Sequence, residues 1–280
     1  MARIGSSERP DWPLAVVVGA GGLGMAVARR LGQSHRLLLA DCDADHTDQA
    51  CAKLRDEGHD AKPAPCDVTR REDVTRLIDQ AAGAGPVRTL AQVVGLSIAA
   101  QDFHAIVEVN LVGAAAVAAA AREIIAPGGC GVFISSSSAH MGAVPDELLP
   151  LIDDPLQAGF TSLLAERLGA EATAANAYMF SKIGLNRMCV RSAGAWGERG
   201  LRIVSLSPGL IATPMGAAAY EHSPGKRRLF DAVPLGRECS MLEIAGVIEF
   251  LASDRASFIS GTDILVDGGM IANLRSRAAN

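Results

Sequence analysis

A glycine-rich turn joins a strand-like run to a helix-like run near the amino end of this chain, and few folds accommodate that order. The valine-rich run Leu14–Val18 leads directly into Gly19-Ala20-Gly21-Gly22-Leu23-Gly24, and the helix-compatible run Met25–Leu31 follows. Glycines here let the backbone approach a pyrophosphate, which then lies against the free amides and positive dipole end of the helix. The feature therefore predicts a dinucleotide-binding unit. A loop that merely turns the chain is the alternative.

The acidic residue at the end of the next apolar run indicates which dinucleotide binds. Arg36–Ala40 ends at Asp41, seventeen residues after Gly24, where a second parallel strand would bring a carboxylate to the adenosine ribose. A carboxylate accepts hydrogen bonds from ribose hydroxyls and repels a 2′-phosphate, by about 4 kcal/mol per unit charge at ~4 Å and an effective dielectric of about 20. No arginine or lysine in the turn or just after Asp41 offsets that charge. We therefore predict NAD(H) rather than NADP(H), with Asp43 and Asp45 in a solvated loop.

Strand-like apolar runs alternate with helix-length segments along the rest of the chain. The strand-like runs are 14–18, 37–40, 61–66, 90–94, 131–135, 201–206 and 264–266. The helix-length segments are 22–31, 47–57, 71–82, 103–125, 177–198 and 242–252. This alternation predicts an α/β fold with a doubly wound, Rossmann-like parallel sheet. With 280 residues, 49% of them hydrophobic, a single domain over 13–272 is the simplest organisation.

One long segment interrupts the alternation. About forty residues separate the strand ending near Ser135 from the helix starting near Ala177, and they include the apolar runs Leu148–Ile152 and Phe160–Leu168. A structureless loop of that length is rare in a compact domain. We therefore expect one or two small helices in an insert at 140–176, over the site or at a subunit contact. The segments 1–12 and 273–280 are expected to be loose ends, and 214–232 is a candidate lid.

Charge and cysteine usage narrow the classes of partner. The formal net charge is −5 without a basic cluster, which argues against nucleic acid or an anionic membrane as the main partner. The six cysteines and six histidines are scattered, so we expect reduced thiols, no metal and a cytoplasmic location. The first dozen residues lack a signal-peptide pattern. The alanine-rich run Leu111–Ala121 is too short to span a bilayer, so we expect an interior helix there.

The sequence Tyr178-Met179-Phe180-Ser181-Lys182 contains a candidate acid–base pair. In a helix, a spacing of four residues places the tyrosine and the lysine on one face, one turn apart. Lowering a phenol pKa of ~10 by roughly three units needs about 4 kcal/mol, much of which a close, desolvated ammonium can supply. The other tyrosine, Tyr220, has Pro224 where a lysine would be required. A half-buried ring beside a solvated charge is the alternative.

Together with motifs further along, these features resemble the short-chain dehydrogenase/reductase family, from about Leu14 to Met270. Within it, the insert and the sequence Ala193-Gly194-Ala195-Trp196-Gly197 resemble bacterial 3α-hydroxysteroid dehydrogenase/carbonyl reductases. The motifs that carry the family resemblance are the glycine turn with Asp41, Cys66-Asp67-Val68, Val109-Asn110-Leu111-Val112-Gly113, Ile134-Ser135-Ser136, Tyr178 with Lys182, Ser207-Pro208-Gly209 with Thr213, and the terminal sequence Gly261–Gly269.

The resemblance implies catalytic roles for four residues. Tyr178 would exchange a proton with the substrate oxygen, and Lys182 would lower the tyrosine pKa and bind the nicotinamide ribose. Ser136 would hydrogen-bond the substrate oxygen, and Asn110 would hold a water that relays protons through Lys182. Because Ser135–Ser138 are four serines in a row, the third of them is the alternative to Ser136. Asn110 has the alternative of capping or kinking its helix.

The same resemblance implies which residues would hold the dinucleotide. Asp67 and Val68 would flank the adenine, and the segment 208–213 would hold the carboxamide. Alternatively, Asp67 caps the helix that starts at Arg71, and Pro208-Gly209 is only a turn. The implied cofactor residues are Gly19, Gly21, Gly22, Leu23, Gly24, Asp41, Asp67, Val68, Gly95, Tyr178, Lys182, Pro208, Gly209, Ile211 and Thr213.

Two stretches depart from the family pattern. Val17 and Val18 stand where the family usually has Thr-Gly, which brings the glycine spacing closer to the longer-chain dinucleotide fingerprint. Gln92-Val93-Val94-Gly95 replaces Asn-Asn-Ala-Gly and removes a polar element that steadies the sheet near the cofactor. We expect cofactor binding to survive, because Gly95 keeps the close approach.

These features favour an NAD(H)-dependent oxidoreductase that interconverts a secondary alcohol and a ketone. The apolar insert and the candidate lid sequence Met215–Tyr220 favour an apolar substrate, steroid-like or alicyclic. A dinucleotide-binding regulator or scaffold with little turnover is the main alternative, and a different chemistry such as dehalogenation or dehydration is a third. The family resemblance further implies a homodimer or homotetramer.

Overall fold

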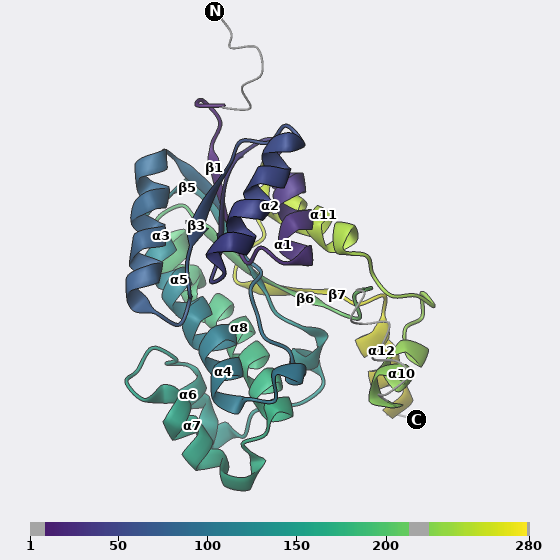
Figure 1. Cartoon of the computed structure of the whole chain (residues 1–280). Helices are drawn as coiled ribbons and strands as arrows, with labels where there is room; N and C mark the ends of the chain where they lie inside the picture. Colours follow the sequence, from purple (N-terminus) through teal and green to yellow (C-terminus); the bar gives the residue numbers. More distant parts are fainter. Residues whose placement is uncertain (1–8, 213–223, 279–280) are drawn as a thin grey trace, which may run out of the picture.

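A seven-stranded parallel sheet forms the centre of the protein (Figure 1). The structure, a computed structural model, describes residues 9–212 and 224–278. Across the sheet the strands lie in the order β3-β2-β1-β4-β5-β6-β7, which confirms the predicted doubly wound fold. The strands are β1 Leu14–Val18, β2 Arg36–Asp41, β3 Ala61–Pro65, β4 Val87–Gln92, β5 Ile125–Ile134, β6 Arg202–Pro208 and β7 Thr262–Val266.

The sheet grows outward from β1 in both directions, to β2 and β3 on one side and to β4 through β7 on the other. Val18, the last residue of β1, aligns with Ala40 of β2 and with Gln92 of β4. Parallel strands share their carboxyl edge, and the loops leaving β1 and β4 diverge at this point of reversal. The fold therefore opens a crevice where the glycine turn begins.

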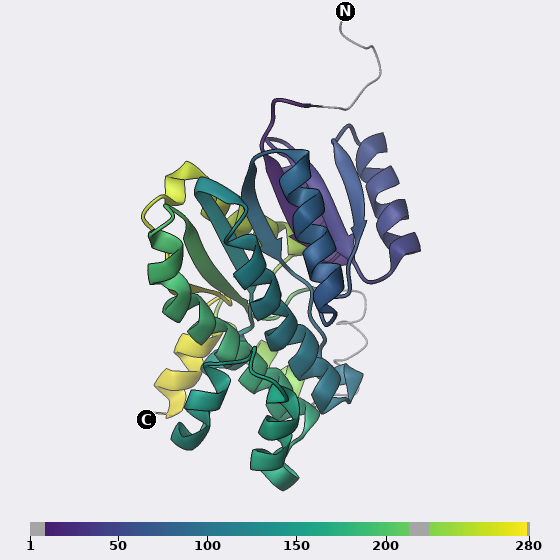
Figure 2. The same ribbon diagram turned by 90° about the vertical axis from the view of Figure 1, so that its left-hand side faces the viewer.

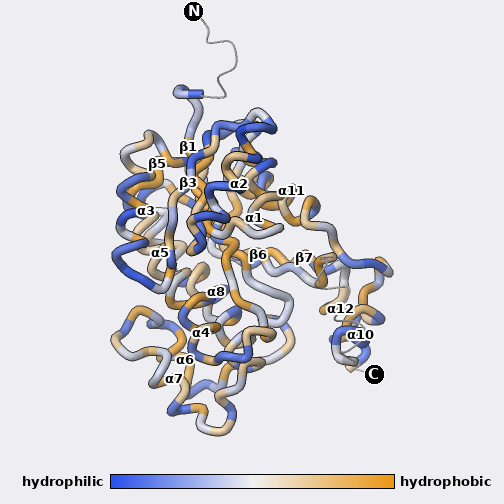
Figure 3. Tube along the Cα trace, viewed as in Figure 1, coloured by the Kyte–Doolittle hydropathy of each residue, from blue (hydrophilic) through white to orange (hydrophobic). Residues whose placement is uncertain are grey.

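Helices cover both faces of the sheet (Figure 1, Figure 2). One core lies beneath α1 Gly22–Leu31, α2 Ala44–Asp56 and α11 Met241–Ala252. The other lies beneath α3 Arg71–Ala84, α5 Ala114–Ala121 and α8 Ala174–Gly197. Because both faces are covered, central strands such as β1 are buried at every residue. Hydrophobic strands contrast with hydrophilic outer turns of α2 and α3 (Figure 3).

The helix predicted for 103–125 is shorter than expected and irregular inside. α4 Phe103–Val107 passes into a π-helical turn, Glu108–Gly113, and then into α5, which ends at Ala121. The residues up to 125 do not continue the helix: β5 starts at Ile125 and contains Pro127 and Gly128, whose φ of 82° is incompatible with a helix.

The apolar part of this helical stretch is nevertheless longer than the predicted run. Phe103–Ala121 spans 19 residues with a mean hydropathy of 1.7, which is long and apolar enough to cross a membrane by length and composition. More than half of it is buried within this fold, and α5 packs between α3 and α8. It is a core helix of the domain, as predicted.

The insert ahead of α8 contains small helices, as predicted. α6 Leu149–Ile152 and α7 Phe160–Leu168 follow the 3₁₀ turns η3 Ser137–His140 and η4 Asp146–Leu148. Apolar side chains of the insert form a separate core with α4 and α8. The insert therefore extends the helical layer beyond the carboxyl edge of the sheet (Figure 1). Its service as a lid or a subunit contact stays a prediction.

Both chain ends are more regular than predicted where the structure describes them. Near the amino end, the Trp12 carbonyl accepts a hydrogen bond from Arg36 Nε (2.8 Å), which ties residues 9–12 to β2. At the carboxyl end, α12 Met270–Ala278 occupies the segment that was expected to fray. The Asp267 carboxylate accepts hydrogen bonds from two backbone N–H groups at the start of α12. Such a cap stabilises the start of a helix, which the polar composition of this segment did not predict.

A short helix, α10 Pro224–Asp231, packs beside α12 in a small apolar cluster of its own. The residues of α10 belong to the second part of the segment predicted as a lid, 214–232. The lid residues 215–220 and the predicted carboxamide residue Thr213 lie outside the described residues.

Candidate active site

Tyr178 and Lys182 lie on one face of α8, as their spacing predicts. Lys182 is 4% exposed, and its Nζ lies 5.8 Å from the centre of the Tyr178 ring. The ammonium donates a hydrogen bond to the carbonyl of Ile134, the last residue of β5 (2.9 Å). This bond fastens the helix that bears the tyrosine to the carboxyl edge of the sheet.

Burial is the main influence on the protonation of both groups. It lowers the pKa of Lys182 to about 8, because a buried ammonium loses its hydration. It raises the pKa of Tyr178, and a hydrogen bond with Ser136 opposes that rise. The predicted lowering of the tyrosine pKa by Lys182 stays a prediction: in this structure the ammonium bonds a backbone carbonyl, and the hydrogen bond with Ser136 is the influence that lowers the tyrosine pKa.

Ser136 is the serine that meets the phenol. Its side chain hydrogen-bonds Tyr178 and accepts the backbone N–H of Ser138 (3.1 Å), which makes Ser136 the cap of the turn η3. Ser135 points elsewhere and donates to the carbonyl of Lys182 (3.1 Å). Ser137, the alternative, is buried within η3. The geometry favours Ser136 over Ser137.

Asn110 lies in the π-helical turn and is 2% exposed. Its Oδ1 accepts the Leu96 N–H (2.7 Å), and its Nδ2 donates to the Leu96 carbonyl (2.9 Å). A Cβ added at Gly95 would lie 3.1 Å from Asn110 Oδ1 and 3.5 Å from Lys182 Nζ. The asparagine thus holds the loop after β4 rather than capping a helix, and π-helical turns of this kind recur at functional sites.

A cavity of about 170 Å³ opens at the carboxyl ends of β4, β5 and β6. Seven predicted site residues line it: Gly95, Ser136, Tyr178, Lys182, Pro208, Gly209 and Ile211. Pro208 ends β6 and Gly209 follows it, and both line the cavity; that they hold the carboxamide stays a prediction. Five lining residues were not predicted: Val93, Leu96, Ser97, Ile134 and Ser135. Their positions just after β4 and around the end of β5 were the available signal.

The glycine turn follows β1 and starts α1. Gly19 has a φ of 110°, and a Cβ there would lie 2.8 Å from a backbone nitrogen of the loop after β4. A Cβ on Gly24 would lie 1.7 Å from the Gly19 carbonyl oxygen, so only glycine fits. Gly21 faces open space, while Gly22 and Leu23 form the first turn of α1. An open helix start framed by close-packed glycines suits a pyrophosphate.

Asp41 ends β2 beside this turn, as predicted. Its Oδ2 accepts the backbone N–H of Ala20 (2.7 Å), so the carboxylate also holds the turn in place. Asp43 is exposed, as predicted, and its side chain also caps α2 by accepting the His46 N–H (2.9 Å); Asp45, predicted in the same loop, is exposed in the first turn of α2. His46, which was not predicted, brings its Nε2 to 3.2 Å from the Ala20 carbonyl oxygen.

Asp67 folds back on its own loop. Its Oδ1 accepts hydrogen bonds from the Thr69 backbone N–H (3.0 Å) and hydroxyl (2.7 Å), while α3 starts after Arg70 without a side-chain cap. The alternative that Asp67 caps α3 is therefore wrong. Val68 packs against Gly113, where a Cβ would lie 2.7 Å from the valine. The loop after β3 is thus held against the π-helical turn.

Comparison with known proteins decides the family. Residues 13–145 match the family described as short chain dehydrogenase, and residues 159–271 match the one described as Enoyl-(Acyl carrier protein) reductase. The short-chain dehydrogenase/reductase bsc3 of Alternaria brassicicola is 32% identical over 266 residues, which cover 92% of this chain and 96% of that protein. The chain belongs to the short-chain dehydrogenase/reductase family. The predicted family and the oxidoreductase class are confirmed.

Other relatives of this short-chain dehydrogenase/reductase carry more specific names. Cis-4-hydroxycyclohexanecarboxylate dehydrogenase of Sinomonas cyclohexanicum is 30% identical, with 92% of this chain and 96% of that protein covered. 3beta-hydroxysteroid dehydrogenase 1 of Eggerthella lenta is 26% identical, with 91% and 92% covered. The crystal structure of gox2181 superposes with a TM-score of 0.76 at 27% identity, with 94% and 96% covered. The family acts on alcohols and ketones with a nicotinamide dinucleotide.

The two departures from the family pattern lie side by side in the structure. The Val18 carbonyl accepts the backbone N–H groups of Val93 and Val94 (2.8 Å each), so the main chain ties β1 to the loop after β4. Gln92 is 2% exposed, and neither atom of its amide has a hydrogen-bond partner among the described residues. The backbone supplies the link between these strands, as far as residues 9–212 and 224–278 show.

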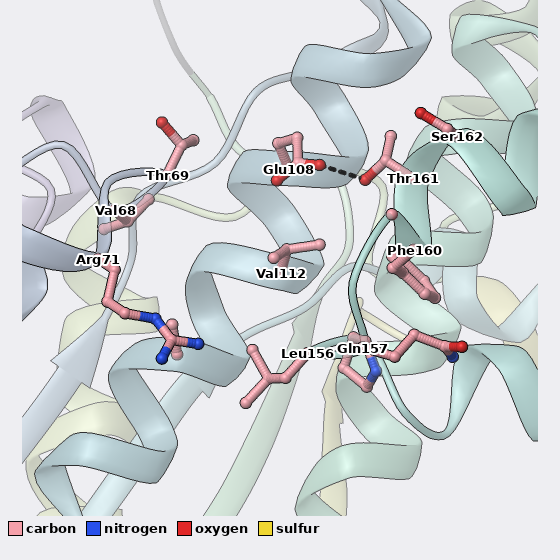
Figure 4. A pocket seen from close by; sticks show the side chains of 13 residues that line it. Val68, Thr69, Arg71, Glu108, Val112, Leu156, Gln157, Phe160, Thr161 and Ser162 are labelled. Carbon is pink, nitrogen blue, oxygen red and sulfur yellow. Dashed lines mark hydrogen bonds between the residues drawn. The ribbon is translucent and has the colours of Figure 1, made fainter.

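A second cavity, of about 230 Å³, has Val68 in its wall (Figure 4). Its walls are the loop after β3, one face of the helix from Glu108 onward, and the insert around Phe160. The Thr161 hydroxyl donates a hydrogen bond to Glu108, which joins the insert to the π-helical turn (Figure 4). This cavity lies apart from the phenol, and none of its walls comes from the Tyr178 helix.

Proposed function

We propose that this short-chain dehydrogenase/reductase uses NAD(H) to interconvert a secondary alcohol and a ketone. The observation that carries the proposal is the position of the Tyr178 phenol at the wall of the 170 Å³ cavity. The phenol is hydrogen-bonded to Ser136, and the Nζ of the buried Lys182 lies 5.8 Å from the centre of its ring. A protonated phenol next to a serine hydroxyl is suited to a carbonyl oxygen that gains charge during reduction.

Residues of the chain itself hold and transfer the proton that the substrate oxygen receives. Because burial raises the pKa of Tyr178, the phenol stays protonated at neutral pH and can act as the acid toward a carbonyl oxygen. Ser136 donates a hydrogen bond to the same oxygen and thereby orients it. Lys182, with a pKa of about 8, exchanges protons readily near neutral pH. The nicotinamide, when bound, supplies or accepts the hydride.

We assign Asn110 to positioning. Both of its amide atoms bond the Leu96 backbone, and Leu96 is part of the cavity wall. Each atom retains a second hydrogen-bonding valence, one lone pair and one N–H. The water relay through Lys182 that the family resemblance implies therefore stays a prediction that this geometry permits.

The residues present fit a dinucleotide with an unphosphorylated ribose. The open start of α1 would take the pyrophosphate, and Asp41 would accept from the ribose hydroxyls with Oδ1, whose contacts with the Asp43 N–H (3.4 Å) and the Cys42 thiol (3.5 Å) are long. The carboxylate also disfavours a 2′-phosphate.

The substrate is an apolar, ring-containing alcohol or ketone in this proposal. Leu96 and Ile211 line the cavity, and the exposed side chain of Ile98 (44% exposed) follows the lining residue Ser97 along the chain. Two relatives are named for ring alcohols, a hydroxycyclohexanecarboxylate and a 3beta-hydroxysteroid. An apolar mouth gains free energy from covering such a ring, at about 25 cal/mol per Å².

Association into a homodimer or homotetramer belongs to the same proposal. β7 is an edge strand whose five residues are all only partly buried, including Ile264, Leu265 and Val266. A partly apolar, unpaired strand edge is a surface that a second copy of the chain can cover. Sedimentation of the purified protein would check this.

Reduced-nicotinamide absorbance tests the proposed function. The purified protein is offered apolar ring alcohols and small polar alcohols with NAD or NADP, alongside Tyr178→Phe. We expect turnover with NAD and ring alcohols, and a loss of roughly 10²- to 10⁴-fold in kcat in the variant, because the proton donor is gone. The variant should still bind NADH, which controls for folding. NADH binding without turnover by the unmodified protein would instead support the regulatory alternative.

A further inference from the structure

We propose that His140 and Asp263 are positioning residues that hold Ser136 against Tyr178. His140 is the last residue of η3, and Ser136 is the cap at the start of the same turn. His140 Nε2 lies 2.7 Å from Asp263 Oδ2, across 123 residues of sequence. The inference rests on the proposed role of Ser136.

Two serines of β6 hold the Asp263 carboxylate by hydrogen bonds. Its Oδ1 accepts hydrogen bonds from the hydroxyls of Ser205 (2.7 Å) and Ser207 (3.0 Å), and both serines are fully buried. Asn186, one turn beyond Lys182 on α8, extends toward the Ser207 hydroxyl (3.5 Å). A carboxylate with three donors is a fixed point on the sheet rather than a mobile surface charge.

The contact between His140 and Asp263 holds the far end of η3, the turn that Ser136 caps. At its first end, the turn continues β5, and Ser135 is bonded to the Lys182 carbonyl. At its far end, the His140 side chain reaches β7, and Arg275 donates a longer hydrogen bond to the His140 carbonyl (3.4 Å). Held at both ends, the turn keeps few conformations, so the direction of the Ser136 hydroxyl is restricted.

The burial of the pair makes its contribution large enough to measure. The His140 and Asp263 side chains are 21% and 12% exposed, so water competes weakly for their hydrogen bond. Removing the imidazole leaves the carboxylate with the two serine hydroxyls and frees the far end of the turn. The loss then falls on the geometry of Ser136, not on the dinucleotide site at β1 and β2.

Turnover in two backgrounds tests the proposal. We expect His140→Ala to lower kcat by roughly ten- to a hundredfold, since small misplacements of reacting groups cost that much, with NADH affinity unchanged. In a Ser136→Ala background, His140→Ala should add no further loss, because it acts through that serine. If His140→Ala lowered kcat by the same factor in the unmodified protein and in the Ser136→Ala background, the proposal would be overturned. A general structural defect would lower kcat by the same factor in both backgrounds, because it does not act through Ser136.

Matched variants keep this test decisive. His140→Gln retains an N–H donor and should recover most of the rate, which also covers the case in which the alanine variant does not fold. Asp263→Ala should match His140→Ala, and the double variant should be no slower than either. His59→Ala removes a partly buried histidine whose side chain contacts the Gly32 carbonyl (3.1 Å), away from η3, and should leave kcat unchanged. A glutamine variant as slow as the alanine variant would contradict the proposal.

A readout without turnover separates this proposal from the proposed function. The chain has two tyrosines, so isotope-labelled tyrosine gives two ring signals by NMR, and Tyr178→Phe identifies one of them. Ser136→Ala and His140→Ala should shift the Tyr178 signal in the same direction. If only Ser136→Ala shifts it, His140 does not position the serine. If the protein turns over no substrate, the proposed function fails while this measurement still decides the positioning role.

Discussion

The two ends of the crevice are built in different ways. At the proposed nucleotide end, the contiguous turn Gly19–Gly24 and one carboxylate, Asp41, would form the site, and its shape depends on the absence of side chains in the turn. At the catalytic end, Asn110, Ser136 and the Tyr178 helix come from separate segments and meet through burial and hydrogen bonds. The nucleotide end therefore depends on local backbone space, and the catalytic end on tertiary packing.

This difference predicts different failure modes. A change at the nucleotide end should alter folding and cofactor choice through the backbone and one charge. A change at the catalytic end should alter protonation and rate while the fold and the dinucleotide affinity persist. The variants below test that division.

The largest effect is expected from Gly24→Ala. The new Cβ would lie 1.7 Å from the Gly19 carbonyl oxygen, so the turn must shift, and we expect a loss of about 3 kcal/mol or more in the free energy of unfolding. Gly21→Ala is the matched control, because its Cβ meets nothing within 4 Å and its φ is −65°. Urea unfolding of both variants is the measurement. Equal stability of the two would show that the turn is not close-packed.

A pH-dependent effect is expected from Lys182. Burial lowers its pKa to about 8 in the folded protein, whereas the unfolded chain holds the proton up to about pH 10.4. Between these values the unfolded state binds more protons, so this group makes stability rise with pH, by up to about 3 kcal/mol. Lys182→Met should remove that rise.

The measurement is the difference in unfolding free energy between the unmodified protein and Lys182→Met, taken from about pH 7.5 to about pH 10. Burial raises the pKa of thiols such as Cys51 to about 11 and Cys66 to about 12, which acts in the opposite direction. Those thiols are present in both proteins, so their contributions cancel in the difference. A constant difference across this range would contradict the lowered lysine pKa.

An intermediate effect is expected from Asp41→Ser. Removing the carboxylate should raise the ratio of kcat/KM for NADP to that for NAD by roughly ten- to a hundredfold, less than the full like-charge repulsion because the site is partly solvated. Asp43→Asn is the control, since asparagine also caps α2 and the residue is exposed. Steady-state rates of both variants with NAD and with NADP measure this ratio. A similar rise in the control would show that general surface charge, not Asp41, sets the preference.

The smallest effect is expected in the insert. Thr161→Val removes the hydroxyl that bonds Glu108, and we expect a loss of about 1 kcal/mol in stability with kcat unchanged, since that contact lies at the second cavity. Ser162→Ala, at the exposed neighbouring hydroxyl, should change stability by less than about 0.5 kcal/mol. Thermal unfolding with parallel rate assays measures both. A lower kcat in Thr161→Val would link the insert to catalysis.

Local patterns predicted most of the fold. β1 and α1 begin and end at the predicted residues, because apolar periodicity and the glycine turn mark both boundaries. Helix caps were harder to recognise: Asp43 belongs to a loop by composition, and its bond to the third residue of α2 is visible only in the structure. The same holds for Asp267 and α12. A capping side chain differs from a loop side chain only in its partner.

The proposed catalytic residues were predicted from their motifs, but their protonation states were not. The spacing of Tyr178 and Lys182 placed them on one helix face, since that follows from helix geometry. It did not reveal that Lys182 bonds the Ile134 carbonyl or that burial raises the tyrosine pKa. Protonation depends on how much water the packed fold excludes.

The amino-acid sequence was sufficient for the order of strands and helices, the glycine turn, the carboxylate at the end of β2 and the tyrosine–lysine pair, because each depends on residues close together in the chain. Tertiary structure alone decided which of four serines meets the phenol and that His140 reaches Asp263. It also decided where the helix around Asn110 adopts π-helical geometry. These outcomes depend on burial and on contacts between distant segments, and no local pattern encodes them.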